Sequence, residues 1–407
     1  MRFTQMRQEN AFRFTDHRLT LVPLTLSTGE RLPCLVDATT WLPVKLATRW
    51  AVSYRRQRVQ ASTLANDLFI LGKLYTWAWE IGGYDLDEQL RHGILPDARQ
   101  LESVVAYLRE QGQPKGGTEV ISPNTVNKYI GTIENFLVWS LAYAQPPLSL
   151  EQRQGRVWQL AVTCRSLRYR GNPSRRQRPL SEAEVVAIRA ALSPQWDDTG
   201  RWHFPENRFT SANALRNWLM VEMALQLGLR LGELLKLRLD SLPRGGQKAL
   251  LIRRHPDDIH DTRRHEPAVK TAERGLPVSD SLLAMIRHYV TGGPPYGRIN
   301  GKSPYLFVTD EGQPLSIGRA QDIIQVIGSR SGIEQLSWHR LRHTWAEQLA
   351  AYLLETPNGQ DQLMYLGGWT NPHSPQRYIQ NAVAEQAQAT LRTWQESLYA
   401  PETRTGS

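Results

Sequence analysis

A run of arginines divides this chain into two parts with different patterning. Residues 165–178 contain no acidic residue and hold six arginines: Arg165, Arg168, Arg170, Arg175, Arg176 and Arg178. Gly171 and Pro173 interrupt any regular helix here. The segment therefore predicts a basic linker between two domains, residues 46–164 before it and residues 179–381 after it. A solvated linker and a linker that also follows a phosphate backbone both agree with this composition.

The composition limits what such a chain binds. The 407 residues suffice for two or three domains, and the formal net charge of +10 favours a polyanion, nucleic acid before an anionic membrane surface. No apolar run approaches the roughly 20 residues that cross a bilayer, and the first residues lack a signal sequence. Only Cys34 and Cys164 occur, which favours a reducing compartment over a disulfide framework or a cysteine zinc site. We expect a cytoplasmic protein.

The first part of the chain changes from extended to helical patterning. Residues 1–45 are expected to form an N-terminal extension with strands or a hairpin, either as a DNA-contacting arm or as a packed strand. Residues 46–164 show helical periodicity, with Ser122 and Pro123 in the cap and first position of one helix. Basic residues outside the apolar stripes and in the linker are the candidate DNA contacts: Arg55, Arg56, Lys128, Arg165, Arg168, Arg175 and Arg176.

The second part mixes helices with a small sheet. Ser181 and Glu184 have the spacing of a capping box, and residues 213–228 predict a strongly apolar helix. Residues 250–253 and 268–278 predict strands of a small sheet, and residues 282–290 and 318–328 predict helices. The polar loop 254–266 contains His255, His260 and His265. We interpret it as a solvated loop in preference to a metal site.

The stretch Ser337–Trp345 places His339, Arg342 and His343 on one stripe of a helix beside an apolar seam. Burying an arginine is costly without a partner anion, and a guanidinium fork matches phosphate oxygens two at a time. The stretch therefore predicts a phosphate site. The alternative is a solvated basic face that includes histidine.

Three further segments carry candidate chemistry. Arg230 follows the apolar helix, and Glu233 lies three residues on and is able to orient it; a simple salt bridge is the alternative. Lys270 lies in an expected tight hairpin, where it either protonates a leaving oxygen or is inert. Tyr378 ends a constrained loop that begins at Leu366-Gly-Gly-Trp369. A phenol beside an anion clamp suits a nucleophile toward phosphorus, although a lone tyrosine more often packs.

Taken in order, these residues resemble the tyrosine recombinase (phage integrase) family. The resemblance rests on Arg230 in Gly-Leu-Arg-Leu-Gly-Glu-Leu, Lys270, His339-Arg-Leu-Arg342-His343, Leu366-Gly-Gly-Trp369 and Tyr378. Trp369 lies nine residues before Tyr378, where most members carry His, and it resembles the Trp variant of Cre recombinase. The lysine hairpin is one residue shorter than is usual. Residues 179–400 carry the resemblance strongly, and residues 46–165 fit the family only by pattern.

The resemblance implies a mainly α fold with a small antiparallel β-sheet, arranged as a two-domain clamp around duplex DNA. The helical core-binding domain (SAM-like) spans 46–164, the catalytic domain 179–381, and a C-terminal helix and tail 382–407. In the family such a helix docks on a neighbouring protomer, which implies a homo-tetramer on two DNA sites with inverted-repeat cores. Whether accessory DNA-bending proteins take part is left open by the resemblance.

The resemblance also implies the chemistry. Tyr378 would attack the scissile phosphate to give a 3′-phosphotyrosyl intermediate, while Arg230 and Arg342 bind the phosphate oxygens. Lys270 would act as general acid, His339 would help to move the tyrosine proton, and Trp369 would hydrogen-bond a phosphate oxygen. Glu233 and His343 would support them, with neither ATP nor a metal required. The expected function is site-specific DNA recombination or integration. The alternatives are type IB topoisomerase-like relaxation and a non-catalytic DNA-binding protein of this fold.

Overall fold

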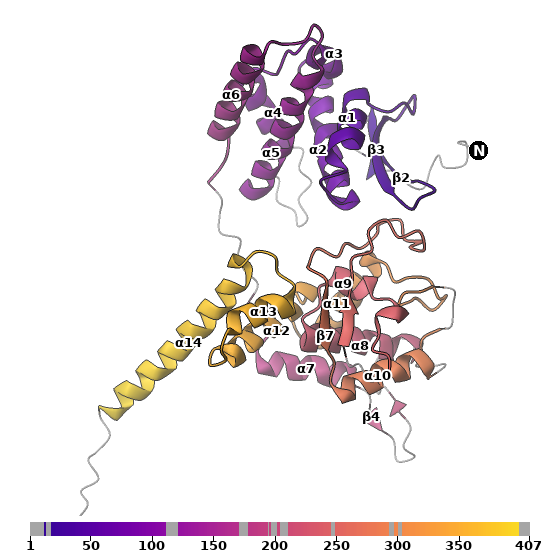
Figure 1. Ribbon diagram of the computed structural model, residues 1–407, viewed down its shortest axis with the longest axis vertical. Helices are drawn as coiled ribbons and strands as arrows, with labels where there is room; N and C mark the ends of the chain where they lie inside the picture. The colour runs from indigo at the N-terminus through magenta and orange to yellow at the C-terminus, as the bar shows by residue number, and fades with distance from the viewer. Residues whose placement is uncertain are drawn as a thin grey trace, which may run out of the picture. The chain divides into compact units, whose positions relative to one another are not determined.

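The computed structural model divides into two compact units, residues 1–176 and 177–407, each considered by itself (Figure 1). The structure describes residues 12–13, 18–110, 121–170, 178–193, 195–196, 202–203, 211–245, 249–292, 297–299 and 303–398. The described residues are mainly helical with small antiparallel sheets, which confirms the predicted fold class. The division between the units falls inside the arginine-rich segment. No helix in these ranges is long and apolar enough to cross a bilayer.

The N-terminal unit is a helical bundle around an aromatic and aliphatic core. Its helices are α1 (Lys45–Trp50), a π-helical turn (Ala51–Arg55), α2 (Ala61–Glu80), α3 (Leu86–Arg91), α4 (Ala98–Glu110), α5 (Pro123–Ser140), a 3₁₀ turn (Leu141–Tyr143) and α6 (Leu150–Ser166). Leu64, Leu68 and Leu71 of α2 are fully buried at helical spacing, in agreement with the helical periodicity of residues 46–164. Trp50 packs edge-on against Phe136 of α5, so α1 is fixed to the bundle.

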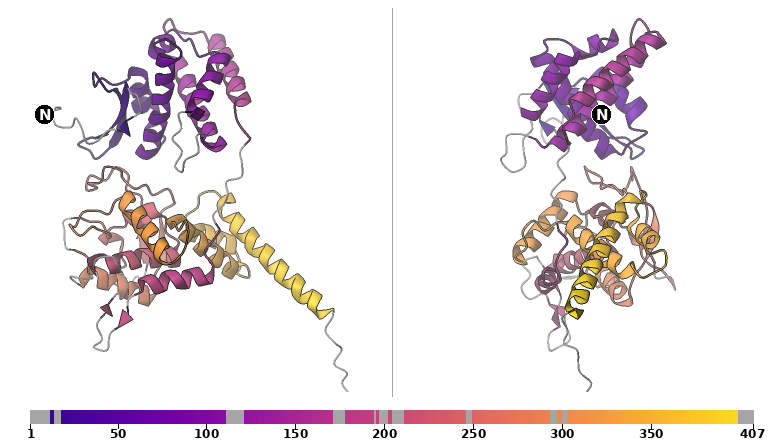
Figure 2. Two further views of the ribbon diagram at one scale, coloured as in Figure 1. Left: turned by 180° about the vertical axis from the view of Figure 1, so that it is seen from behind. Right: turned by 90° about the vertical axis from the view of Figure 1, so that its left-hand side faces the viewer.

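An N-terminal hairpin packs on this bundle. Strands β2 (Leu19–Thr25) and β3 (Arg31–Asp37) pair antiparallel, and β1 (Phe12–Arg13) pairs with β2. Leu21 and Leu35 belong to the same buried cluster as the helices, and the hairpin lies along α2 (Figures 1 and 2). The expected hairpin is therefore present. The expected domain boundary at residue 45 does not divide the hydrophobic core, because apolar side chains from both sides of it belong to one buried cluster.

Helix starts follow the sequence signals. The Ser122 side chain accepts a hydrogen bond from the Thr125 backbone, and Pro123 occupies the first turn of α5. Ser181 and Glu184 form the predicted capping box of α7 (Glu182–Leu192). These local signals predict helix starts well because the bonds they make lie within one turn.

The C-terminal unit builds its core on α8 (Ser211–Leu227). Leu215, Leu219, Met223 and Leu227 are buried, in agreement with the strongly apolar helix expected at residues 213–228. Around α8 the structure describes α9 (Leu231–Lys236), a 3₁₀ turn (Leu239–Ser241), α10 (Asp280–Thr291), α11 (Ile317–Arg330), α12 (Trp338–Leu353), α13 (Gly359–Gly367) and α14 (His373–Ser397). Short strand pairs join β4 (Gln195–Trp196) to β5 (Trp202–His203) and β6 (Ala249–Ile252) to β7 (Arg274–Pro277).

The β6–β7 pair differs from the tight hairpin expected around Lys270. Ile252 pairs with Arg274, so residues 253–273 form one long connection, and only residues 274–277 of the predicted strand 268–278 are extended. The tight hairpin was expected to reverse the chain close to Lys270, but the strand that pairs with β7 is β6, much earlier in the chain. Lys270 consequently lies in an irregular segment that leads into β7.

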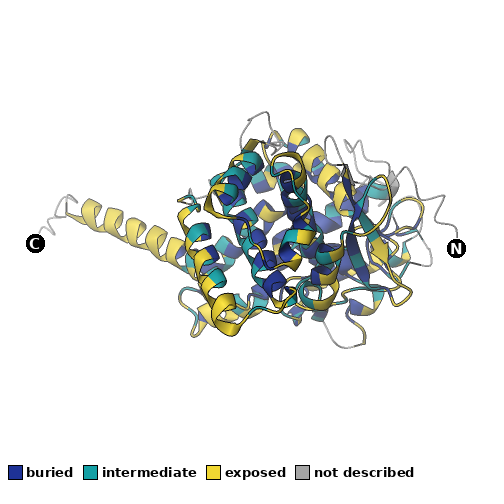
Figure 3. Ribbon diagram, turned by 90° about the horizontal axis from the view of Figure 1, so that it is seen from above, coloured by how far each residue is buried: buried dark blue, intermediate teal, exposed yellow. Residues whose placement is uncertain are grey.

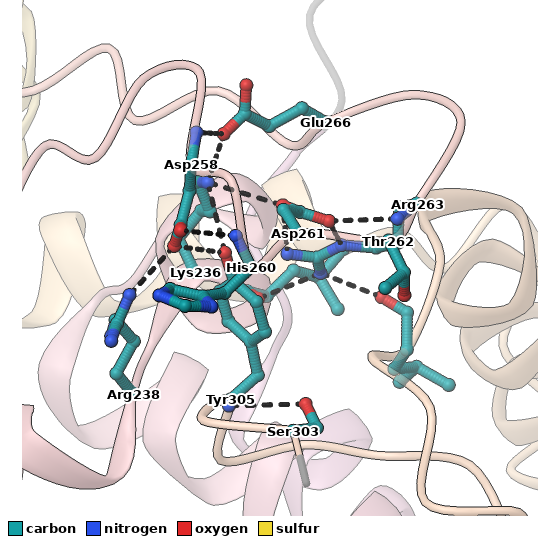
Figure 4. Close-up of polar contacts among 12 residues, drawn as sticks. Lys236, Arg238, Asp258, His260, Asp261, Thr262, Arg263, Glu266, Ser303 and Tyr305 are labelled. Carbon is teal, nitrogen blue, oxygen red and sulfur yellow. Dashed lines mark hydrogen bonds and ion pairs between the residues drawn. The ribbon is translucent and has the colours of Figure 1, made fainter. Parts of the chain in front are cut away.

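The polar loop 254–266 is also different from the solvated loop that was expected. Asp261 is buried and forms ion pairs with Lys236 (3.3 Å) and Arg263 (2.7 Å), and Lys236 also contacts Glu266. Tyr305 and Arg238 both bind Asp258, at 2.6 and 2.8 Å (Figure 4). These buried pairs fix the loop to α9, because breaking one leaves an uncompensated charge in the interior. The described residues contain no group of three or more potential metal ligands.

Helix α14 overturns two further expectations. It runs without a break from His373 to Ser397, so Tyr378 lies in the second turn of a helix and not at the end of a loop. The predicted separate tail helix from Ala382 is the continuation of that helix. Side chains from Val383 onward in the described part are exposed, and Figure 3 shows this half in yellow.

Candidate active site

Helix α12 positions the His-x-x-Arg-His stripe. Ser337 caps its first turn, and Arg340 binds Glu184 of α7 at 2.9 Å, which fixes the start of α12. From this turn the Arg342 side chain points into the interior, with only 2% exposed, while His339 stays accessible and His343 is half-buried. The His339 and His343 rings meet edge to face with centroids 4.2 Å apart.

Arg342 joins the two glycine-containing motifs. Its Nη1 donates to the carbonyl of Gly228 at 2.5 Å and its Nη2 to the carbonyl of Gly367 at 2.7 Å. The guanidinium carbon lies 4.7 Å from the centre of the Trp369 ring. Segments distant in sequence are thus held around one buried cation.

Glycine is required beside this cation. Gly228 has φ +61°, and a Cβ there would lie 2.1 Å from the ring of Trp345. A Cβ at Gly367 would lie 2.0 Å from the ring of Trp369. Both motifs need glycine because tryptophan rings fill the space that a side chain would take.

Arg230 and Glu233 open helix α9. The Arg230 backbone N–H donates to Glu233 at 2.6 Å, and the buried carboxylate also accepts from Arg274 at 2.7 Å and from the Thr271 hydroxyl. Arg342 approaches it to 3.8 Å. Burial alone would raise the pKa of Glu233, but Arg274 and the other donors hold it below its usual range. Glu233 is therefore bonded to the backbone of Arg230 and not to its guanidinium, and the carboxylate belongs to a larger cluster.

Positive charge exceeds negative charge in this cluster. Three guanidinium groups, from Arg230, Arg274 and Arg342, share the Glu233 carboxylate. Burial, with the nearby charge of Arg230, lowers the pKa of Arg342 to about 9. Nη1 of Arg230 and Nη2 of Arg274 are buried without a hydrogen-bond partner among the described residues. Buried donors and excess charge of this kind suit a phosphate oxygen.

Tyr378 lies at the edge of the cluster, 3% exposed. Its hydroxyl is 2.6 Å from Nδ1 of His343 and accepts a hydrogen bond from Arg377. Its ring packs against Trp369 at 5.7 Å. The imidazole that contacts the phenol is therefore His343, whereas sequence reasoning gave the tyrosine proton to His339. Partial burial and the charges of Arg342, Arg230 and Arg377 lower the pKa of His339.

Lys270 is next in sequence to a residue of this cluster. Its side chain is exposed, and the next residue, Thr271, binds Glu233. Thr271 and Arg274 were absent from the site predicted from the sequence, although both lie within four residues of Lys270. Arg377 was also missed, because nothing but its place before Tyr378 marked it.

The candidate DNA contacts fall into two groups. Lys128 and Arg165 are exposed on α5 and α6, and Arg168 is exposed but bonded to Glu134 at 2.9 Å. Arg55 instead binds buried Asp67 at 2.8 Å, and Arg56 donates to the Arg31 carbonyl at 3.1 Å. These two guanidinium groups therefore bond to partners within the N-terminal unit. Arg175 and Arg176 lie outside the described residues.

Sequence comparison identifies relatives of the C-terminal unit. The profile of the phage integrase family matches residues 202–385. The tyrosine recombinase XerC of Alcanivorax borkumensis is 28% identical over 137 residues, which are 33% of this chain. The chain spans 39% of the length of that relative.

Structural comparison extends the similarity of fold to both units. A Tn1549 transposon integrase in complex with circular intermediate DNA is 15% identical, with a TM-score of 0.53 over 84% of this chain and 99% of that one. The XerH site-specific recombinase bound to difH is 15% identical, with a TM-score of 0.50 over 80% of this chain and 78% of that one. The family profile across residues 202–385 and the XerC relative place the C-terminal unit, which holds the site, in the tyrosine recombinase (phage integrase) family.

Proposed function

We propose that this protein is a site-specific recombinase that cuts and rejoins DNA through a 3′-phosphotyrosyl intermediate and exchanges strands between two sites. One observation carries the proposal. The Tyr378 phenol, bonded to an imidazole, lies at the edge of a buried cluster whose three guanidinium groups share one carboxylate. A phosphodiester brings the negative charge that this cluster lacks.

Arg230 and Arg342 are the proposed phosphate clamp. Arg230 keeps a buried N–H without a partner in the described structure, so it has a donor to offer a non-bridging oxygen. Arg342 is held in place by the carbonyls of Gly228 and Gly367, and its charge adds to that of Arg230. Fixed donors stabilise the charge that builds on phosphorus in the transition state. Glu233 has the supporting role of orienting these groups.

The proton transfers complete the proposed reaction. The Tyr378 oxygen bonds to phosphorus while its proton passes to the imidazole pair, directly to His343 and with His339 beside it. The bond to the 5′-oxygen breaks, and Lys270 gives that oxygen a proton. Trp369 holds the phenol ring and offers its indole N–H to the phosphate. One ester replaces another, so the reaction needs neither ATP nor a metal.

The proposed partner is duplex DNA with inverted-repeat core sites, bound by four copies of the chain on two sites. The similar integrase and XerH structures were determined with DNA. Exposed Leu391 and Trp394 on α14, with Leu398 directly after its last residue, give each copy an apolar stripe for its neighbour. Accessory DNA-bending proteins are compatible with this assembly.

Covalent capture tests the proposal. The protein is incubated with fragmented DNA of its host and mobile elements, quenched in SDS, and the protein-linked ends are sequenced. A Tyr378→Phe variant is the control, since it keeps the ring and removes the attacking oxygen. We expect Tyr378-dependent adducts on the 3′ ends at one or two inverted-repeat sites. A two-plasmid assay carrying the captured site should then yield recombinant products.

Other outcomes assign other functions. Tyr378-dependent adducts scattered over the DNA, with relaxation of supercoils, would indicate a topoisomerase. DNA binding without an adduct would indicate a non-catalytic DNA-binding protein. Either result would overturn the proposed recombinase.

A further inference from the structure

Arg377 touches the two groups between which the proposed reaction moves its first proton. Its Nη2 donates to the Tyr378 hydroxyl oxygen and lies 3.3 Å from Nδ1 of His343. Its guanidinium carbon is 4.5 Å from the centre of the Tyr378 ring. None of these contacts reaches the phosphate clamp, so Arg377 acts on the nucleophile.

The chemistry of guanidinium fixes the direction of these hydrogen bonds. Arginine has donors and no acceptor, so the Tyr378 oxygen accepts from Arg377, and the 3.3 Å approach of the same nitrogen to Nδ1 of His343 fits an unprotonated Nδ1 whose single lone pair serves the shorter contact with Tyr378. Nδ1 therefore carries no proton, and the neutral His343 ring is protonated at Nε2. The Tyr378 O–H then donates to Nδ1 across the 2.6 Å contact. This order makes His343 ready to receive the phenolic proton.

No carboxylate of the described residues forms an ion pair with Arg377. The Nε of Arg377 is buried without a partner among these residues. Glu347 feels the charge of Arg377 but is hydrogen-bonded to Asn381 at 3.2 Å. A half-buried cation beside an oxygen stabilises negative charge on that oxygen more strongly than the same cation in water.

We propose that Arg377 is a catalytic residue that stabilises the Tyr378 oxygen as it becomes a phenolate. In cleavage, the phenolic O–H bond breaks, its proton goes to Nδ1 of His343, and the oxygen electron pair forms the bond to phosphorus. In rejoining, that bond breaks and Arg377 stabilises the departing phenolate until it regains its proton. The inference rests on the proposed function and adds a group that acts on the nucleophile.

The test compares Arg377 with an exposed arginine of the same helix. Arg377→Gln, Arg377→Lys and the control Arg392→Gln are assayed for the single-turnover rate of covalent adduct formation on the captured DNA site. Arg377→Gln should slow the step by about 100-fold, the usual cost of one donor to a developing oxyanion. Arg377→Lys should lose less because it keeps the charge, and Arg392→Gln should match the unmodified protein. DNA affinity, measured in the Tyr378→Phe background, should stay constant.

A more acidic nucleophile separates this role from a structural one. When Tyr378 is replaced by 3,5-difluorotyrosine, the phenolate needs less help, so the deficit of Arg377→Gln should shrink to less than about 10-fold. A packing defect would leave the deficit unchanged, which would overturn the inference. So would an Arg377→Gln rate equal to or above that of Arg392→Gln. If the unmodified protein forms no Tyr378-dependent adduct, the proposed function fails and this inference fails with it.

Discussion

Glu233 is the residue on which the charge balance of the site depends. Its carboxylate is buried, accepts from Arg274 and Thr271, and lies 3.8 Å from Arg342. The Glu233→Gln substitution keeps the shape and removes the charge. We expect the free energy of unfolding to fall by about 3–5 kcal/mol, because buried cations lose their counter-charge.

Urea denaturation followed by circular dichroism measures this effect. Asp322→Asn is the matched control, since Asp322 is exposed and its pair with Arg319 is long, at 3.9 Å. That control should change the free energy of unfolding by less than about 0.5 kcal/mol. Equal losses in the two variants would show that the buried cluster does not depend on its carboxylate.

His339 predicts how stability responds to pH. Its pKa is lowered in the folded protein, so on acidification the unfolded chain binds a proton before the folded chain does. The His339 contribution to the free energy of unfolding should therefore decline as pH falls from the ordinary histidine value of 6.5 toward the lower folded pKa. Above that value both states are neutral and the contribution is constant.

Unfolding measured at several pH values in the unmodified protein and in His339→Asn isolates this contribution. The other histidines are common to both proteins, so the difference between the two curves belongs to His339. We expect the variant to gain relative stability on acidification. Parallel curves would contradict the lowered pKa.

At the scale of elements, α14 combines the proposed nucleophile, Tyr378, with an exposed arm. Truncation after Glu385 keeps the Asn381–Glu347 hydrogen bond and the buried Ala382 but removes the apolar stripe at residues 391–398. We expect the shortened protein to form the Tyr378 adduct on a single site and to fail to join two sites. Native gels of the protein–DNA complexes, with a Leu391→Ser/Trp394→Ser variant beside them, report the assembly. Paired sites at full yield would exclude the arm as the contact between copies.

Local signals predicted the helices of this fold better than its connections. Ser122, Ser181 and Glu184 marked true helix starts because their partners lie three residues away. The loop before Lys270 was misjudged because its partners Lys236 and Tyr305 are distant in sequence. Tyr378 was placed in a loop because Gly367, Gly368 and Pro372 end α13, and the new helix begins directly after them.

The candidate site was likewise predicted where local motifs mark it and missed where the direction of a side chain decides. Arg230, Glu233 and Arg342 were recognised from motifs, and the structure brings them together. Arg377 and Thr271 act through the direction in which their side chains point, which no spacing in the sequence specifies. Distances also decided which histidine meets Tyr378, since His339 and His343 lie one helical turn apart and both face the site.

At the scale of the whole molecule, the net charge of +10 makes DNA affinity depend on salt. Exposed Lys128 and Arg165 are suited to phosphate contacts, whereas Arg55 neutralises buried Asp67. Replacing Lys128 or Arg165 by Ala should lower the slope of log K against log salt by about 0.9 per lost phosphate contact. Arg55→Ala should instead lower stability.

Fluorescence anisotropy across a salt series measures the slope, and thermal unfolding measures the stability. A Glu102→Ala variant, with an exposed carboxylate on α4, controls for changes in overall charge. Unchanged slopes for both Lys128→Ala and Arg165→Ala would place the DNA on another face of the unit.

Because α14 is unbroken, a movement at its exposed end is passed on to Tyr378 in reduced size. Tyr378 and Ser397 are ends of one rod of roughly 28 Å, given a rise of about 1.5 Å per residue, and only the first turns are packed. A displacement of several ångströms at the far end is reduced to a fraction of an ångström at the phenol. Hydrogen-bond strength changes over that same small range. In the proposed assembly, a neighbour bound to the far end of α14 would therefore change how well the Tyr378 hydroxyl meets His343 and Arg377, and with it the reactivity of each copy.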